Sequence, residues 1–310
     1  MILLMDMGTS NTRLFLFDGQ TVLDTEKGSF GAGSTLSEGR AFLEASVKTL
    51  IGTLLTRNGI AERDISGIVA SGMASSELGI CEVPHLAAPA TLCDLVDGIK
   101  TVKVEAITDI PFFIVPGVRK NNADGEIEDM MRGEETETFG ICDLMGIEGD
   151  AVLVLPGSHN KILVLDENGA ICDFVTCMSG ELMSAVSGHT ILRGAVSYDY
   201  ALDEAALHEG ATFAKENGLG AALFRVRVQT KRQDASPDAI SSFFSGAVLS
   251  ADAELAKRYA KQGRRVYVGG KESLRHALAI LIGSDAQELL DAVSGSAVSH
   301  GLSLICRKMK

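Results

Sequence analysis

One short pattern occurs twice in this chain and constrains its fold more than any other feature. Residues 5–13 read MDMGTSNTR and residues 155–161 read LPGSHNK, and each stretch leads into an apolar run. Gly157 follows Gly8 by 149 positions (157 − 8), which is close to half of the 310 residues. Each copy predicts an apolar strand, a tight Gly-hydroxyl-x-Asn turn and a second apolar strand, and thus a β-hairpin. The spacing indicates that each half of the chain carries one copy of a duplicated unit.

The composition of the two turns indicates a chemistry. A glycine followed by hydroxyl and amide side chains suits a turn whose backbone N–H groups approach phosphate oxygens. The alternative is two ordinary hairpins, because Gly, Ser and Asn are common turn residues. A single hairpin would favour that alternative, whereas the matched pair favours a polyphosphate ligand gripped from both sides.

Composition excludes some classes of protein. The formal net charge of −13 argues against a nucleic-acid surface, which needs clustered Lys and Arg. The apolar run at residues 1–5 is broken by Asp6, and it is too short for a signal peptide or a membrane helix. The six cysteines show no metal-ligand spacing, so free thiols in a reducing cytoplasm are the simplest account. Whether the chain forms a homodimer stays open.

The order of the predicted elements indicates two α/β domains. Each half begins with consecutive strands and continues with strands that alternate with helices, which predicts mixed sheets flanked by helices. We expect domains at residues 1–147 and 148–310. The polar segment 119–128 is predicted to be an exposed loop, a helix is expected to begin near Asp129, and the last helix is expected over residues 296–307.

Several residues could serve phosphoryl transfer, which needs positioned phosphates, Mg²⁺ and a base near the accepting hydroxyl. Asp6 ends the first strand, where its carboxylate could hold Mg²⁺ through water; the alternative is a carboxylate that caps the turn. The remaining candidates are phosphate-binding residues of the two hairpins, with Lys161 as a point charge: Gly8, Thr9, Ser10, Asn11, Thr12, Gly157, Ser158, His159 and Lys161.

Two further features have an ordinary structural alternative. Gly269 and Gly270 follow an apolar run and would let an adenine ring pack against the backbone, although strand-to-helix turns often contain glycine. Glu134 and Glu135 are adjacent, so on a helix they point about 100° apart and only one can enter a site. Such a carboxylate could accept a proton from an attacking hydroxyl, or it could offset the dipole at a helix N-terminus.

Longer motifs resemble those of a known family. MRGEET at 131–136, PGSHNK at 156–161 and SGEL at 179–182 resemble, in order, the MRGEET, PGTHxK and TGEL signatures of 2-dehydro-3-deoxygalactonokinases. The opening DMGTSNTR is similar to DWGSTNLR of that family, and further similarity spans essentially the whole chain. The chain departs at Met7, Ile80 and Ile162, where the family usually has Trp.

The resemblance implies the actin/hexokinase/Hsp70-type fold, with two duplicated ribonuclease H-like domains and Mg·ATP in the cleft between them. It implies ATP-dependent phosphorylation of the 6-hydroxyl of a 2-keto-3-deoxy sugar acid, with Glu134 as the base. We expect the sugar acid to contact five polar residues: Arg13, Ser75, Ser76, Arg132 and Glu181. Arg132 could instead pair with Glu135 or Glu128.

Two other classes of function remain open. One is an ATP-binding sensor of the same fold, without efficient kinase activity. The other is a carboxylate-based hydrolase built on Glu134 and Glu181, which would leave the two phosphate-type hairpins unexplained.

Overall fold

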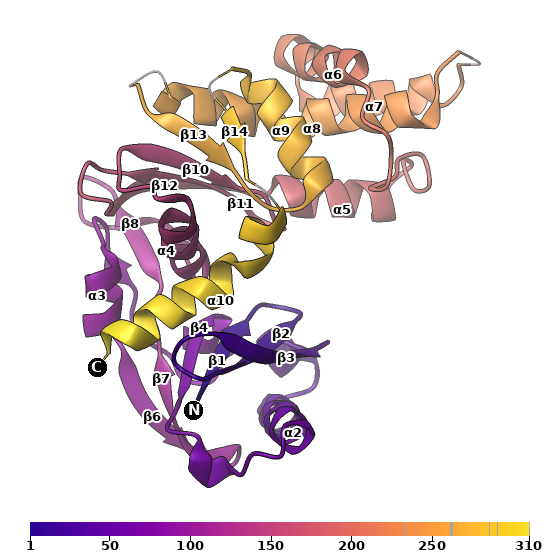
Figure 1. The fold of residues 1–310 in the computed structure, drawn as a ribbon. Coiled ribbons are helices and arrows are strands. Elements are labelled where there is room, and N and C mark those ends of the chain that lie inside the picture. Colours follow the sequence, from indigo (N-terminus) through magenta and orange to yellow (C-terminus); the bar gives the residue numbers. More distant parts are fainter. Residues whose placement is uncertain (233, 261–262, 285, 290, 310) are drawn as a thin grey trace. The chain divides into compact units, whose positions relative to one another are not determined.

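The computed structural model describes residues 1–232, 234–260, 263–284, 286–289 and 291–309, and its ribbon is drawn in Figure 1. The chain divides into two compact units. The first comprises residues 1–148, 169–172 and those from Gly295 onward; the second comprises 149–168 and 173–294. The predicted division at residue 147 placed the end of the chain in the second half, whereas the structure groups that segment with the first unit.

The first unit is built on a six-stranded mixed sheet in the order β3-β2-β1-β4-β7-β6. β1 pairs antiparallel with β2 and parallel with β4, so that Asp6 lies opposite Arg13 on one side and Ser71 on the other. The strands are β1 (Ile2–Met7), β2 (Thr12–Phe17), β3 (Val22–Gly28), β4 (Ile68–Gly72), β6 (Lys100–Val104) and β7 (Thr108–Ile114).

The second unit repeats this arrangement. Its five-stranded sheet has the order β12-β11-β10-β13-β14, in which β10 pairs antiparallel with β11 and parallel with β13. The strands are β10 (Ala151–Leu155), β11 (Asn160–Leu165), β12 (Ile171–Cys177), β13 (Arg265–Val268) and β14 (Ala286–Glu288). The expected mixed sheets are therefore confirmed, and both copies of the sequence pattern form the hairpin that begins each sheet.

Helices flank both sheets, and the apolar residues of each unit form a core between sheet and helices. α2, for example, buries Leu43, Val47, Leu50 and Leu54, which recur at helical spacing. The helices are α1 (Ser34–Ser37), α2 (Arg40–Arg57), α3 (Leu92–Asp97), α4 (Glu134–Met145), α5 (Ser179–His189), α6 (Glu204–Asn217), α7 (Leu219–Gln229), α8 (Pro237–Ala260), α9 (Glu272–Ile282) and α10 (Asp291–Lys308), with 3₁₀ turns at Glu62–Asp64 and Met73–Ser75.

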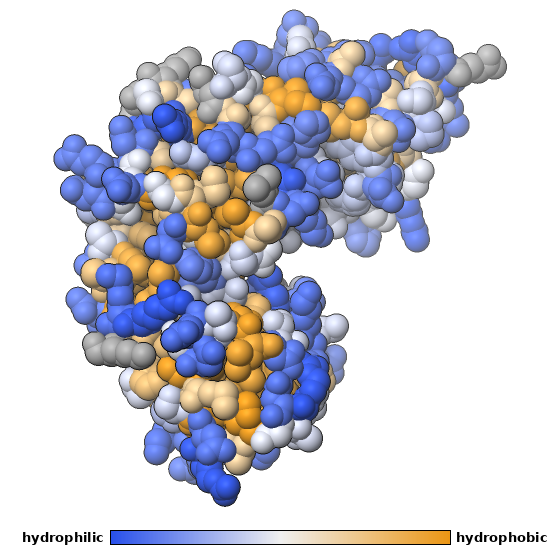
Figure 2. Space-filling model, viewed as in Figure 1, coloured by the Kyte–Doolittle hydropathy of each residue, from blue (hydrophilic) through white to orange (hydrophobic). Residues whose placement is uncertain are grey.

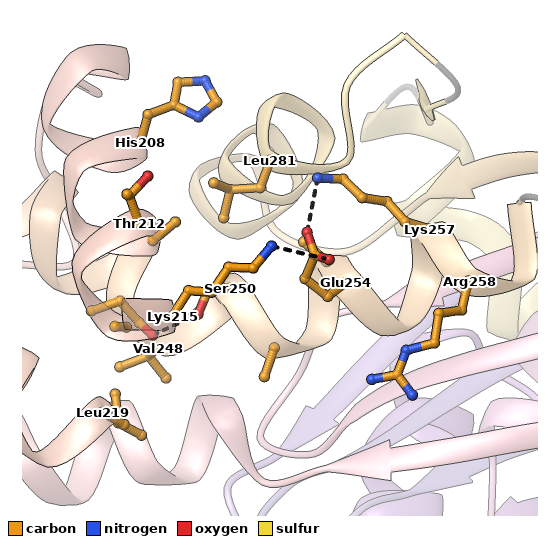
Figure 3. Close-up of a pocket in the computed structure, with 15 residues that line it drawn as sticks. His208, Thr212, Lys215, Leu219, Val248, Ser250, Glu254, Lys257, Arg258 and Leu281 are labelled. Atoms are coloured by element: carbon orange, nitrogen blue, oxygen red, sulfur yellow. Dashed lines mark hydrogen bonds and ion pairs between the residues drawn. The ribbon is translucent and has the colours of Figure 1, made fainter. Parts of the chain in front are cut away.

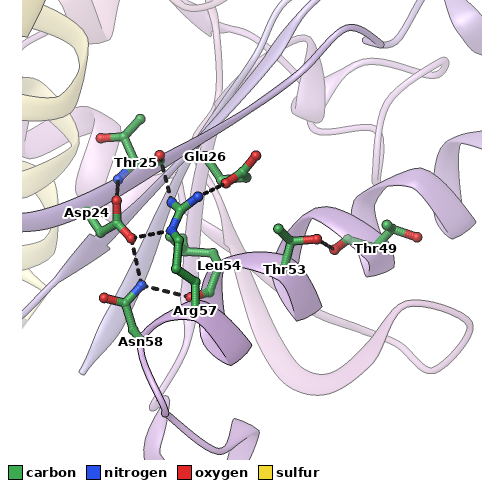
Figure 4. Close-up of polar contacts among 8 residues, drawn as sticks. All are labelled: Asp24, Thr25, Glu26, Thr49, Thr53, Leu54, Arg57 and Asn58. Carbon is green, nitrogen blue, oxygen red and sulfur yellow. Dashed lines mark hydrogen bonds and ion pairs between the residues drawn. The ribbon is translucent and has the colours of Figure 1, made fainter.

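An arginine at the end of α2 fastens this helix to the edge strand β3 (Figure 4). The Arg57 guanidinium donates to Asp24 Oδ2 at 2.8 Å, to the Thr25 carbonyl at 3.0 Å and to Glu26. Asn58 Nδ2 donates to the same Asp24 oxygen at 2.7 Å. The hydrogen bond from Arg57, followed by that from Asn58, lowers the pKa of the Asp24 carboxyl to about 2.

A small three-stranded sheet lies where the sequence suggested a loop. Its order is β5-β8-β9, with β5 (Leu86–Ala87), β8 (Val118–Asn121) and β9 (Ile127–Met131). The predicted loop at 119–128 is confirmed only for residues 122–126, which form the turn between β8 and β9, and the predicted helix start near Asp129 is wrong. β8 and β9 form an antiparallel hairpin whose turn is closed by Asn122, since its side-chain oxygen accepts from the N–H groups of Asp124 and Glu126.

α10 begins at Asp291, five residues before the predicted start, and packs closely against α4 in the first unit. A Cβ atom on Gly140 would lie 1.9 Å from the Ala297 carbonyl oxygen, and one on Gly301 would lie 2.0 Å from that of Thr136. The two glycines therefore permit the close approach of these helices.

Hydrophilic residues make up most of the face seen in the space-filling view, with apolar groups scattered between them (Figure 2). Within the residues that the structure describes, no helix is both long and apolar enough to span a membrane.

Candidate functional site

The turn between β1 and β2 offers donors to solvent. Gly8 N–H donates to the Asn11 carbonyl at 2.8 Å, which closes the turn, and the side chains of Thr9, Ser10 and Asn11 are exposed. Thr12 differs from its predicted role, because its side chain is fully buried and its hydroxyl donates to the Phe30 carbonyl at 2.8 Å. The hydroxyl of Thr12 thus holds the nearby segment at Phe30, and the side chains of Thr9, Ser10 and Asn11 remain exposed at the turn.

Asp6 and Arg13 face each other across the first hairpin. Arg13 Nε and Nη2 both donate to Asp6 Oδ2, at 2.9 and 2.6 Å. The Asp6 side chain is 15% exposed and that of Arg13 is 40% exposed. Arg13, predicted to contact the sugar acid, therefore has the Asp6 carboxylate as its partner in this structure.

Two glycines bring the start of α4 next to Asp6. A Cβ atom on Gly72, at the end of β4, would lie 2.5 Å from the Met7 carbonyl oxygen and 3.4 Å from Asp6 Oδ1. A Cβ atom on Gly133, which caps α4 with a φ of +110°, would lie 3.2 Å from the Gly72 Cα. The end of β1, the end of β4 and the first turn of α4 therefore meet at one place.

The adjacent glutamates of α4 have different environments. Glu134 is partly exposed, whereas Glu135 is 1% exposed and accepts the Gly133 N–H through both carboxylate oxygens at 2.8 Å. Burial, reinforced by the Glu134 charge, raises the pKa of Glu135 to about 8. The divergence expected of successive helical residues is thus seen, with Glu135 directed into the protein.

Glu137 is a member of this cluster that the sequence analysis missed. It follows Glu134 by three residues and so shares its face of the helix. Burial and the charges of Glu134 and Asp6 raise the pKa of Glu137 to about 7, and Arg13 opposes this shift. The i, i+3 spacing was the signal that could have found it.

The pKa of Glu135 predicts how stability changes with pH. Between about pH 5 and pH 8 the native protein retains a proton that the unfolded chain has released, so the free energy of unfolding should fall as pH rises. Glu135→Gln should flatten this dependence by an amount on the order of a few kcal/mol, since each pKa unit corresponds to about 1.4 kcal/mol. Urea unfolding at a series of pH values measures it. Glu167→Gln, at an exposed position, is the control; equal slopes in wild type and Glu135→Gln would contradict the assignment.

Arg132 lies just before α4 and has neutral partners. Its Nη1 donates to Ser75 Oγ at 2.7 Å and to the Val83 carbonyl at 3.1 Å, and its Nη2 lies 3.4 Å from His85 Nδ1. Burial lowers the pKa of the guanidinium. Pairing with Glu135 or Glu128 by a salt bridge, the alternative considered above, is not observed among the described residues.

The two predicted serines are both buried. Ser75 contacts Arg132 and also donates to the Gly72 carbonyl at 3.0 Å. Ser76 is 7% exposed, and its hydroxyl donates to the Met73 carbonyl at 2.8 Å. The structure therefore places Ser75 with Arg132, while the Ser76 hydroxyl holds its own turn.

Buried hydrogen bonds hold the turn of the second hairpin in place. Asn160 Oδ1 accepts the Gly157 N–H at 3.0 Å, and Asn160 Nδ2 donates to Asp252 Oδ2 at 2.6 Å. Ser179 Oγ donates to the other oxygen of Asp252 at 2.8 Å. Burial raises the pKa of the Asp252 carboxyl, while these hydrogen bonds oppose the shift. Asp252, which the sequence analysis missed, thus ties α8 to the turn and to α5.

The exposed part of this turn lies beside the start of α5. Gly157, Ser158 and His159 are exposed, and His159 Nε2 lies 2.8 Å from Glu181 Oε2. Glu181 N–H donates to the Ser158 carbonyl at 2.8 Å. Glu181, predicted to contact the sugar acid, therefore lies in the second unit against the phosphate-type turn.

Lys161 does not have the position predicted for it. The residue is 4% exposed, and Nζ donates to Thr176 Oγ1 on β12 at 2.6 Å. The ammonium group therefore bridges neighbouring strands, and the exposed turn does not include it.

Gly269 and Gly270 follow β13 beside the second hairpin. A Cβ atom on Gly270, whose φ is +82°, would lie 2.6 Å from Pro156 Cγ. A Cβ atom on Gly269 would lie 3.3 Å from Leu155 Cδ2. The contact with Leu155 and Pro156 accounts for both glycines structurally, and their predicted role at an adenine ring stays a prediction.

A cavity of about 590 Å³ lies elsewhere in the second unit, among α6, α8 and α9 (Figure 3). Glu254 on its wall forms ion pairs with Lys257 at 3.2 Å and Lys215 at 3.9 Å. None of the predicted site residues lines this cavity, so it is separate from both hairpins.

The donor set fits the ligands that a kinase requires. Mg²⁺ prefers oxygen ligands and keeps several waters, so it is often bound through one or two carboxylates and substrate phosphates. Asp6 offers such a carboxylate. Within the described part of the chain no three His, Cys, Asp or Glu residues are grouped as a metal site. The exposed hydroxyl and amide groups of the turns fit phosphate oxygens.

Comparisons with known proteins identify the family. The model of the family described as 2-keto-3-deoxy-galactonokinase matches residues 6–305. A Rhizobium meliloti protein described as a 2-dehydro-3-deoxygalactonokinase is 30% identical over 72% of this chain and 69% of its own length. The Escherichia coli 2-dehydro-3-deoxygalactonokinase is 25% identical over 82% of this chain and 80% of its own length.

Solved structures agree on the fold. A Sinorhizobium meliloti protein described as a 2-dehydro-3-deoxygalactonokinase has a TM-score of 0.78 at 24% identity, with 100% of this chain and 99% of that chain covered. The activator of 2-hydroxyisocaproyl-CoA dehydratase from Clostridium difficile, solved with bound ADPNP, has a TM-score of 0.54 at 13% identity over 99% and 94% of the two chains. With the family match across almost its whole length, the chain belongs to the 2-keto-3-deoxy-galactonokinase family of sugar-acid kinases.

Proposed function

We propose that this protein transfers the γ-phosphoryl group of Mg·ATP to the 6-hydroxyl of a 2-keto-3-deoxy sugar acid, with 2-dehydro-3-deoxy-D-galactonate as the preferred acceptor. The names of the two relatives support the acceptor. The single observation that supports the proposal is the meeting of Asp6 with the first turn of α4, because it brings the carboxylate that we assign to the metal near the carboxylate that we assign as the base. We propose the cytoplasm, where ATP is available, as the location.

We assign the nucleotide to the two exposed turns. Thr9, Ser10 and Asn11 with the Gly8 backbone supply hydrogen-bond donors in the first unit, and Ser158 and His159 with the Gly157 backbone supply them in the second. Gly269 and Gly270 border the adenosine in this proposal. Asp6 is the residue that would hold Mg²⁺, and the metal would neutralise charge that develops on the phosphates.

We assign the sugar acid to the first unit. The planar guanidinium of Arg132 can grip the carboxylate, and its neutral hydrogen-bond partners leave its charge available. The Glu134 carboxylate accepts the proton of the 6-hydroxyl as the oxygen bonds to the γ-phosphorus. The bond from that phosphorus to the bridging oxygen breaks, and ADP leaves.

A panel of acceptors tests the proposal. The protein is incubated with ATP, Mg²⁺ and individual 2-keto-3-deoxy acids that differ in the configuration at C4 and C5, and ADP release is followed in a coupled assay. The galacto-configured acid should give the highest kcat/KM, and omission of either Mg²⁺ or the acid should abolish ADP release. Binding of ATP without turnover of any acid would indicate a sensor, and the kinase proposal would then be wrong.

A further inference from the structure

Arg119 on β8 is a cation that the fold does not neutralise. Its side chain forms no hydrogen bond or ion pair with any described residue, and its Nε is shielded from solvent. The residue is half-buried, and a shielded N–H group without a hydrogen-bond partner is unfavourable. The protein has a net charge of −13, so an unpaired and partly buried arginine is unexpected unless an anionic ligand completes its environment.

The strand register places Arg119 on the same face of the small sheet as Arg132. Arg119 lies opposite Met130 on β9, two residues before Arg132, and successive side chains of a strand alternate between faces. Gly117, two residues before Arg119, supports this placement. A Cβ atom on Gly117 would lie 2.8 Å from both Arg132 Cγ and His85 Cδ2, so Arg132 lies on the face to which Gly117 points. The opposite face carries Val118 and Met131, which are buried.

Asn121 ends β8, where the pairing with β9 shifts register. It follows Arg119 by two residues on β8, and its Oδ1 is shielded from solvent without a hydrogen-bond partner in the described structure. Arg119 therefore presents an unused donor and Asn121 an unused acceptor. Buried polar groups are rarely left unsatisfied, and those that are call for an explanation such as a missing ligand or water.

The spacing along the sheet suits a six-carbon acid. Two residues of a strand span roughly 6–7 Å. Arg119 lies opposite Met130, which precedes Arg132 by two residues, so Arg119 is displaced from Arg132 by about that distance in the direction away from α4. Five single bonds of about 1.5 Å, the distance from C1 to C6, extend over roughly 6 Å. An extended six-carbon acid is therefore long enough to reach from Glu134 along the face that bears the two arginines.

We propose that Arg119 binds the α-keto carboxylate end of the sugar acid together with Arg132, and that Asn121 accepts a hydrogen bond from one of its hydroxyl groups. The inference rests on the proposed function and extends its acceptor site along β8. Arg119 thereby determines the preference for an acid over a neutral sugar.

Arg119→Gln tests this inference with two acceptors: the sugar acid and the neutral 3-deoxyhexulose that carries a hydroxymethyl group in place of the carboxylate. With the acid, kcat/KM should fall roughly 10- to 100-fold, mostly through KM, as expected for a lost hydrogen bond to a charged group. With the neutral compound, kcat/KM should change less than about threefold, and KM for ATP should stay constant. Arg119→Lys should retain part of the preference because it keeps the charge.

Lys120→Met is the matched control, because Lys120 is the next residue on β8, lies on the opposite face and pairs with Glu128 at 3.5 Å. It should leave both acceptors unaffected. Thermal unfolding separates binding from a structural role: Arg119→Gln should keep or raise Tm, since it removes an uncompensated charge. A lower Tm with an unchanged preference for the acid would overturn the inference. If the wild type phosphorylates no 2-keto-3-deoxy acid, the proposed function itself is wrong, and the two failures are thereby distinguished.

Discussion

Replacing Glu134 by glutamine should lower kcat by roughly 10²- to 10⁴-fold, the usual range for loss of a general base. Glutamine keeps the size and hydrogen-bonding capacity of the side chain but cannot accept the proton of the sugar hydroxyl. KM for ATP should barely change, because the base acts on the sugar. The lower end of the range is the more reasonable, since a loose phosphoryl-transfer transition state needs its base late. Steady-state kinetics with saturating ATP and sugar acid measures the effect.

Glu135→Gln is the matched control for this experiment. Glu135 is buried and holds the Gly133 N–H, so its replacement should change the pH dependence of stability and leave kcat within a few-fold of wild type. If Glu135→Gln proves the damaging change and Glu134→Gln is mild, the base has been assigned one residue too early. If both are mild, Glu181 is the next carboxylate to test.

Asp6→Asn should be the other strongly damaging change, with turnover reduced by about 100-fold or more, because a bound metal contributes several kcal/mol to charge stabilisation at the phosphates. The half-saturating concentration of Mg²⁺ should also rise. Activity is measured across a Mg²⁺ titration at fixed ATP. Near-normal kinetics would remove Asp6 from the site.

The ion pair of Asp6 with Arg13 calls for its own control, since Asp6→Asn also breaks that contact. Arg13→Gln removes the pair and keeps the carboxylate. If the carboxylate serves the metal, Arg13→Gln should leave the Mg²⁺ requirement close to that of wild type. If both variants show the same loss, the ion pair is what matters and the metal role of Asp6 is wrong.

The parts of the fold that follow from local pattern could be predicted from sequence. Gly8 and Gly157 stand in tight turns between apolar runs, so the hairpins β1–β2 and β10–β11 were expected, and their repetition predicted duplicated mixed sheets. The small sheet could not be predicted in the same way. Residues 119–128 are mostly polar, and the strand β8 is stabilised by neighbours distant in sequence, such as β5, rather than by an apolar pattern of its own.

The sequence identified several residues of the site correctly, but it did not show where their side chains point. Thr12 and Lys161 follow the turns directly, but each is already a strand residue whose side chain is buried within its unit. Arg132 was recognised, whereas its partners Ser75, Val83 and His85 come from another segment and became evident only in the fold. Glu137 shares a helix face with Glu134 by its i, i+3 spacing, whether the helix begins near 129 or at 134, but its burial and its proximity to Asp6 became evident only in the fold.

The most direct test of the account is to identify the phosphorylated atom. Purified protein is incubated with Mg·ATP and ¹³C-labelled 2-dehydro-3-deoxy-D-galactonate, and the product is examined by ¹³C and ³¹P NMR. The account predicts a phosphate monoester whose phosphorus couples to C6, formed in equal amount to ADP. A phosphorus coupled to another carbon, or ADP formed together with free phosphate and unmodified sugar acid, would contradict it.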